Sequence, residues 1–272
     1  MKKLVVMLIV LSAFLYFNGY RGPKTRVLRI GVECAYEPNN WEETRKTDSN
    51  VPLANHPGLY VEGYDIQIAL LVADEINANV EFYKLAWQDL LPALNRGEID
   101  AVFSGMFDTE ERRKLAAFTE TYESAKSEYG IIVNKHSKYS GARTLEDFSG
   151  AKLLAQRSTK LDSAIDQVPG AVHMPPVDTV SETLQRVVNG EVDGLVINVD
   201  TGRSYERTYS NLKLITFPAG KGFTLDFHGV CAGVRKRDKE LLHDINDAIR
   251  SISLRERKRI MDASISRVWR NF

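Results

Sequence analysis

Apolar residues occur in short runs of strand length at several points along the chain. Residues 27–32 form the first such run, rich in β-branched side chains, and further strands are predicted over 80–85 and 99–103. Between the first two strands, residues 37–63 are rich in Asn, Pro, Thr and Gly, which predicts a long loop.

Between these runs the apolar positions change to helical spacing. Ile66, Ala69, Leu70, Ala73 and Ile76 fall on one helical stripe that begins at Tyr64. A second helix is predicted over 88–95, with Gly97 at its C-terminal stop position. The alternation of strands and helices predicts an α/β fold around a largely parallel sheet.

One segment of this pattern occurs twice. The letters LNRGEIDAV at 94–102 are echoed by VNGEVDGLV at 188–196, each comprising a helix end, a Gly-Glu-apolar-Asp turn and an apolar strand. Two copies in different halves of the chain predict two lobes of similar construction. In open α/β sheets ligands bind beyond the carboxyl ends of strands, so residues 104–106 and Asn198 are expected to face one cleft.

The N-terminus predicts export. Lys2 and Lys3 precede an apolar run over 4–17, a pattern typical of a secretory signal and short for a membrane span. No small-x-small cleavage site follows the run. Residues 1–22 are therefore expected to be a signal peptide or an uncleaved anchor, and the remaining alternative is a buried first helix.

Length and charge narrow the class of protein. A chain of 272 residues suits two domains, and equal numbers of basic and acidic residues, 36 each, give no indication of a nucleic-acid partner. The five histidines form no metal-spaced cluster, and no nucleophile elbow or phosphate loop is present. We therefore expect no cofactor, no metal and no catalytic residues.

Cys34 and Cys231 lie far apart in the sequence, each in an apolar context. In an exported protein they either form a disulfide or remain small buried side chains. Both alternatives stay open, because a sequence does not supply the geometry of a bridge.

Five motifs, in order, resemble the polar amino-acid branch of the periplasmic solute-binding proteins. They are VECAYEP at 32–38, GYDI at 63–66, LLPAL at 90–94, SGMFDTEERRKLAAFTETY at 104–122 and FSGAK at 148–152. The resemblance implies the periplasmic binding protein-like II fold: two α/β lobes joined by a two-strand hinge. Lobe one would comprise 26–125 plus 228–272 and lobe two 126–227, with crossings near 124–127 and 224–229.

The resemblance also implies a function. A monomer in the periplasm, or on the outer face of the cytoplasmic membrane, would capture a small carboxylate ligand, such as an amino acid. Closure of the lobes would then present the ligand to the membrane permease of an ABC transporter.

Arg112 is the principal candidate for the ligand's carboxylate. A guanidinium matches a carboxylate bidentately, and the family places its carboxylate-binding arginine at this point of the Thr109-Glu110-Glu111-Arg112 pattern. The alternative is that Arg112 belongs to a solvated run of charges. Thr109 is expected to cap the helix that begins at Glu110.

The other candidates lie at matching positions of the resemblance. Aromatic side chains, strand ends and a helix-opening turn would line the pocket, and the plainer alternatives are core packing, a solvated acid and an ordinary N-cap by Ser158. The expected ligand-binding set is Glu33, Tyr36, Trp87, Ser104, Gly105, Met106, Arg112, Ser158, Thr159 and Asn198.

Three positions depart from the family pattern. Phe107 replaces a hydroxyl residue, Asn39 replaces an aromatic residue, and Asn198 replaces the acid that pairs with the ligand's α-ammonium. Since a buried ammonium needs a charged or strongly hydrogen-bonded partner, Asp200 or Glu33 would have to compensate. Otherwise the ligand is not a standard α-amino acid.

Two other functions remain open. The same fold includes dehydratases that act on small carboxylates, for which Glu33 would be the candidate acid in the cleft. A retained anchor at 4–17 would instead suit a ligand sensor at the membrane surface.

Overall fold

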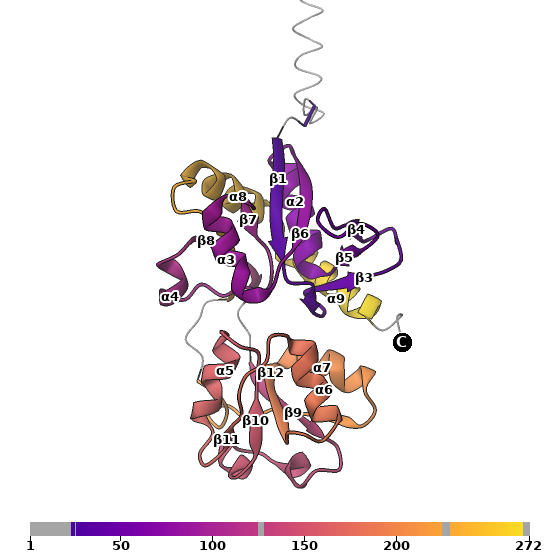
Figure 1. Cartoon of the computed structure of the whole chain (residues 1–272), viewed down its shortest axis with the longest axis vertical. Coiled ribbons are helices and arrows are strands. Elements are labelled where there is room, and N and C mark those ends of the chain that lie inside the picture. The colour runs from indigo at the N-terminus through magenta and orange to yellow at the C-terminus, as the bar shows by residue number, and fades with distance from the viewer. Residues whose placement is uncertain (1–22, 25, 125–127, 225–228, 269–272) are drawn as a thin grey trace, which may run out of the picture.

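Two sheets, each with its own helices, form two bodies that lie one above the other in Figure 1. The computed structural model describes residues 23, 24, 26–124, 128–224 and 229–268. The predicted signal or anchor at 1–22 lies outside the described residues, as do most of the two predicted crossings between the lobes.

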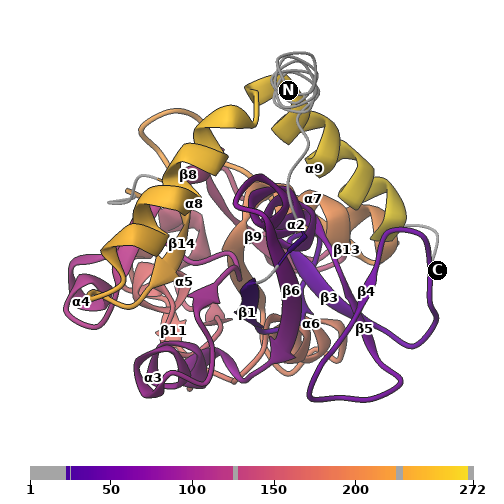
Figure 2. The same ribbon diagram turned by 90° about the horizontal axis from the view of Figure 1, so that it is seen from above.

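The first sheet has the strand order β6-β1-β7-β14-β8. Its strands are β1 (Arg26–Val32), β6 (Ala78–Lys84), β7 (Ala101–Val102), β8 (Ala117–Ser124) and β14 (Gly229–Val234). The associated helices are α2 (Tyr64–Glu75), α3 (Leu90–Arg96), α4 (Glu110–Arg113), α8 (Lys239–Ser251) and α9 (Leu254–Val268). Helix α2 packs against α8 and α9, so the C-terminal end of the chain completes the first body (Figure 2).

The second sheet has the order β11-β10-β12-β9-β13. Its strands are β9 (Tyr129–Asn134), β10 (Lys152–Leu154), β11 (Val172–His173), β12 (Gly194–Asn198) and β13 (Leu212–Ile215). Its helices are α5 (Lys160–Ala164), α6 (Val180–Val188) and α7 (Val199–Thr208), with short 3-10 turns at Lys138–Gly141, Leu145–Phe148 and Ile165–Gln167. Each body buries its own apolar cores, as two separate lobes require.

The repeated Gly-Glu-apolar-Asp turn does the same structural work in both lobes. The Asp100 carboxylate accepts a hydrogen bond from the backbone N–H of Arg29 in β1 (3.1 Å), and Asp193 accepts one from Lys152 in β10 (2.8 Å). The backbone N–H of each aspartate returns a bond to the carbonyl of the same partner. The repeated sequence therefore corresponds to the same pair of hydrogen bonds in each lobe, which links two neighbouring parallel strands.

Several predicted elements differ from the structure. The predicted loop 37–63 contains β3 (Asn40–Glu43), β4 (Val51–Pro52) and β5 (Tyr60–Glu62), which form a small sheet with β2 (Ala35–Tyr36). The strand predicted over 99–103 is confined to β7, and both large sheets are mixed rather than largely parallel.

The second predicted helix begins with a 3-10 turn, Trp87–Asp89, and continues as α3. It ends as predicted at Gly97, whose φ of 80° is the left-handed conformation favoured by glycine. Cys34 and Cys231 are both buried free thiols, so no disulfide joins them.

Candidate functional site

Arg112 is held in place by a short helix at the end of lobe one. Thr109 caps α4, as predicted, by accepting a hydrogen bond from the Arg112 N–H (3.3 Å). The guanidinium lies over the Trp87 ring, 5.0 Å from its centroid, and donates to the Phe107 carbonyl (2.9 Å). Among the residues that the structure describes, no carboxylate lies within ion-pair distance of it. Burial lowers the pKa of Arg112 to about 10, which leaves it charged at neutral pH.

Glu33 lies at the end of β1, with only 5% of its surface exposed. Its backbone N–H donates to the Ser104 hydroxyl (2.9 Å), and its carboxylate accepts a hydrogen bond from the side-chain amide of Gln156 in lobe two. Burial raises the pKa of Glu33 to about 7, against the smaller opposing effect of the bond from Gln156. Glu33 is therefore not the solvated acid of the plainer interpretation.

Tyr36 and Gly105 pack closely at the base of the cleft. A Cβ atom on Gly105 would lie 2.8 Å from the Tyr36 ring, and the φ of Gly105 is +60°, so a side chain is excluded here. The Tyr36 ring also packs against a core cluster of lobe two, and its hydroxyl bonds to Thr201 in α7. Beneath this pair, the carboxyl group of Asp65 accepts the N–H of Gly105.

Lobe two contributes to the cleft mainly through the turn that precedes helix α5. Ser158 has a φ of 59°, and its carbonyl accepts hydrogen bonds across the cleft from the Trp87 indole (3.2 Å) and from Arg112 (3.4 Å). Thr159, rather than Ser158, caps α5: its hydroxyl accepts the N–H of Asp162 (3.3 Å) and donates to the Gln156 carbonyl (2.6 Å).

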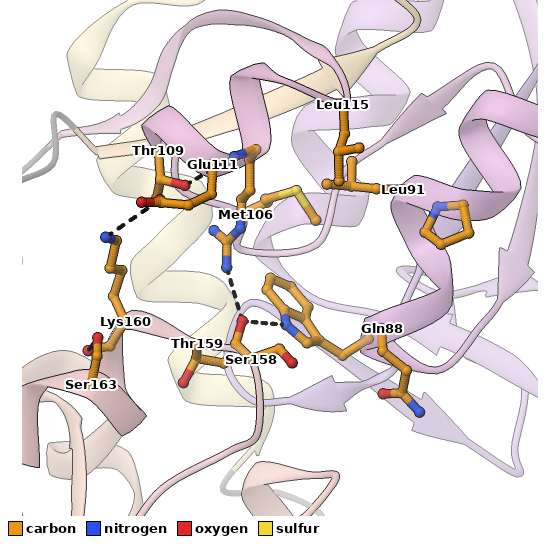
Figure 3. Close-up of a pocket in the computed structure, with 13 residues that line it drawn as sticks. Gln88, Leu91, Met106, Thr109, Glu111, Leu115, Ser158, Thr159, Lys160 and Ser163 are labelled. Carbon is orange, nitrogen blue, oxygen red and sulfur yellow. Dashed lines mark hydrogen bonds and ion pairs between the residues drawn. The ribbon is translucent and has the colours of Figure 1, made fainter.

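Two of the cavities between the lobes share the side chains of Trp87, Arg112, Thr159 and Lys160. The inner cavity has a volume of about 30 Å³ and is lined in addition by Glu33, Tyr36, Ser104, Gly105, Phe107, Gln156 and Leu161. The outer one, drawn in Figure 3, has a volume of about 500 Å³. Its further lining residues are Gln88, Leu91, Pro92, Met106, Thr109, Glu111, Leu115, Ser158 and Ser163.

Nine of the ten expected residues therefore line one or both cavities, and Asn198 lines neither. The Asn198 side chain is buried and caps α7, where its oxygen accepts the N–H of Asp200 (2.8 Å). The Asp200 side chain is 55% exposed beside Arg203 and lines neither cavity. The compensation expected from Asp200 thus finds no support in this arrangement, whereas Glu33 lines the inner cavity, where its carboxyl group is bonded to Gln156.

The expected ligand-binding set left out some of the residues that meet across the cleft. Gln156 and Lys160 are the first and last residues of the predicted helix-opening turn, 156–160, but no cross-cleft contact was expected of them. Gln156 bonds to Glu33, and Lys160 forms an ion pair with Glu111 of lobe one (3.6 Å). Leu91 and Leu115, whose side chains point toward one another in Figure 3, were also not predicted. Leu91 lies on the apolar stripe of the second predicted helix, which marks it as buried but gives no indication of a cavity.

Comparison with known proteins identifies the family. The model of the bacterial extracellular solute-binding proteins, family 3, matches residues 28–263. The chain belongs to this family. It is accordingly a solute-binding protein and not an enzyme, and the resemblance predicted from the motifs is confirmed.

Relatives of the solute-binding protein cover most of its length. ABC transporter arginine-binding protein 1 of Escherichia coli is 26% identical over 254 residues, 93% of each chain. A probable histidine-binding protein of Campylobacter jejuni is 23% identical over 229 residues, 83% of this chain and 79% of the relative.

The solved structures agree with the two-lobed fold. An amino acid ABC transporter substrate-binding protein from Streptococcus pneumoniae, bound to L-arginine, superimposes with a TM-score of 0.75 at 16% identity, covering 89% of this chain and 95% of that chain. An ancestral arginine-binding protein bound to arginine has a TM-score of 0.69 at 25% identity, covering 91% and 98% respectively. Within the described part of the solute-binding protein, no helix is both long and apolar enough to cross a membrane.

Proposed function

We propose that the protein captures an amino acid or amino-acid-like carboxylate between its two lobes and delivers it to the permease of an ABC transporter. Relatives named for arginine, histidine and glutamine binding support the ligand class. The proposed site consists of Glu33, Tyr36, Trp87, Ser104, Gly105, Met106, Arg112, Ser158 and Thr159. Asn198 would act on it only indirectly, as the cap of α7.

The observation that supports this proposal best is the environment of the Arg112 guanidinium. It is a partly buried cation at the junction of both cavities, with carbonyl oxygens and an aromatic face around it and no carboxylate within ion-pair distance among the described residues. A buried charge is costly unless it is paired. A ligand carboxylate would supply the missing partner in the bidentate geometry that arginine favours.

The division into lobes is part of the same proposal. Lobe one would comprise 26–125 plus 228–272 and lobe two 126–227, and the separate sheets and cores of the two bodies support this division. The place of action would be the periplasm or the outer face of the cytoplasmic membrane, as membership of an extracellular family supports. The protein would act there as a monomer.

Arg112→Ala tests the proposal. Two charge-assisted hydrogen bonds of roughly 1.5–3 kcal/mol each imply that the variant binds its carboxylate ligand at least about 100-fold more weakly. Isothermal titration against the common amino acids and their deaminated analogues measures this loss.

Arg113→Ala is the matched control. Arg113 is the next residue of the same helix, and it is exposed and paired bidentately with Asp108 (2.7 Å). Its removal is expected to leave ligand affinity unchanged. Equal losses in the two variants, or an unchanged affinity in Arg112→Ala, would contradict the proposal.

A further inference from the structure

The outer cavity is the larger of the two, and apolar side chains of lobe one form one of its walls. Trp87, Leu91, Pro92, Met106 and Leu115 of lobe one line it, and we call these five residues the apolar wall. Its volume of about 500 Å³ lies within the range of small-molecule sites. The inner cavity, about 30 Å³, offers space for little more than a water molecule or two in this arrangement of the lobes.

Part of the apolar wall faces solvent: Leu115 and Pro92 are exposed and Trp87 is half-buried, whereas Leu91 and Met106 are buried. Leu115 keeps 51% of its surface exposed, although a leucine of this size is worth about 1.5–3 kcal/mol when fully buried. Figure 3 shows its side chain and that of Leu91 directed toward one another along the same wall, beside Met106. An apolar chain lying against these side chains would bury surface that now contacts water.

The charges around the outer cavity favour an anion at one end only. Arg112 forms part of its lining and has no carboxylate partner within ion-pair distance among the described residues. The other charged side chains of the lining, Glu111 and Lys160, are paired with each other (3.6 Å). A ligand ammonium placed here would meet no unpaired carboxylate. Glu33 lines only the inner cavity, where its carboxyl group accepts the bond from Gln156 and where about 30 Å³ leaves no room for an ammonium group. The oxygen of Asn198 is used by the α7 cap.

We propose that the outer cavity binds the apolar chain of the ligand, and that this ligand is a monocarboxylate without a charged amine at its α-carbon. The carboxylate pairs with Arg112 and the chain lies along the apolar wall. The inference rests on the proposed function and specifies the ligand class of the same site. Acylated amino acids and simple alkanoates share this chemistry.

A homologous series of probes tests the inference. N-formyl-, N-acetyl-, N-butanoyl- and N-hexanoylglycine are titrated by calorimetry, in parallel with free glycine, L-leucine and the alkanoates from butanoate to octanoate. Since each buried methylene contributes about 0.8 kcal/mol, affinity is expected to rise roughly fourfold per methylene in whichever series is bound. The free amino acids are expected to bind at least tenfold more weakly than their N-acetyl derivatives.

Leu115→Asp is expected to remove most of this dependence on chain length, because it places a charge on the apolar wall. Leu254→Asp makes the same exchange at a leucine in α9 that is 73% exposed and lines neither cavity, and it is expected to retain the dependence. The comparison separates loss of the wall from a general effect of an added charge.

The outcomes distinguish the inference from the proposed function. Tighter binding of a free amino acid than of its N-acetyl derivative, abolished by Arg112→Ala, would overturn the inference and leave the proposed function intact. An affinity independent of chain length, or equally reduced in both leucine variants, would also overturn the inference alone. If no carboxylate binds, or if Arg112→Ala leaves binding unchanged, both fall.

Discussion

At the scale of single residues, the ionisation of Glu33 makes the stability of the folded protein depend on pH. The folded-state pKa of Glu33, about 7, lies above the ordinary value of 4.5, so between these values the folded protein binds more protons than the unfolded chain. Stability is therefore expected to decrease as the pH rises through this window. The bond donated by the Gln156 amide favours the ionised form and offsets only part of the effect of burial on the pKa of Glu33.

Glu33→Gln tests this assignment, because the amide cannot ionise. The variant is expected to gain thermal stability relative to the parent at pH 8 and to differ little at pH 5, as measured by differential scanning calorimetry. Asp65 and Glu123, whose pKa values burial raises to about 7 and about 8, also titrate in this range. The informative quantity is therefore the difference between variant and parent, and a difference that does not change with pH would contradict the assignment.

The site shows how far residue-level prediction extends. Arg112, Ser104 and Tyr36 could be placed because each belongs to a motif whose spacing matches the family. Gln156 and Lys160 could not, since their contacts depend on where the opposite lobe lies. Asn198 was expected to face the cleft because its strand ends there, but its side chain turns back to cap α7. A strand end specifies where a residue lies and does not determine which hydrogen bond its side chain makes.

At the scale of elements, the repeated turn carries a prediction. Asp193→Ala removes one bond between a carboxylate and a backbone N–H and is expected to cost about 1–2 kcal/mol of unfolding free energy. Asp100→Ala is expected to cost more, because Asp100 also pairs with Arg29 (2.9 Å) and Arg235 (2.8 Å). Urea denaturation measures both losses. Asp48→Ala, at an exposed aspartate, is the control, and equal losses at 100 and 193 would contradict the argument.

Elements with clear periodicity were predicted well, and short ones were not. Helix α2 begins at the predicted Tyr64 because its apolar stripe extends over three turns. The small sheet within 37–63 was missed because its strands are two to four residues long and carry polar side chains. Strands this short show no period of their own, so only pairing in three dimensions identifies them.

At the scale of the whole molecule, two lobes were predictable from the echo at 94–102 and 188–196, but their mutual contact was not. Among the described residues, four polar contacts span the cleft in addition to the packing of Tyr36 and the bond of its hydroxyl to Thr201. The donors of these four contacts are Trp87, Arg112, Gln156 and Lys160, and each acceptor lies on the opposite lobe. These contacts surround the proposed carboxylate site, so binding and lobe closure are expected to be linked.

Trp87→Phe tests that linkage, because it keeps an aromatic face beneath Arg112 and removes the indole N–H that reaches Ser158. Loss of one neutral hydrogen bond, about 1 kcal/mol, is expected to shift the ratio of closed to open molecules roughly fivefold toward open. Small-angle scattering would then give a larger radius of gyration for the variant, and a saturating carboxylate ligand would reduce it. Trp41→Phe is the control, since Trp41 donates to Glu43 within lobe one (2.8 Å). If both variants scatter as the parent does, the contact from Trp87 to Ser158 does not hold the lobes together.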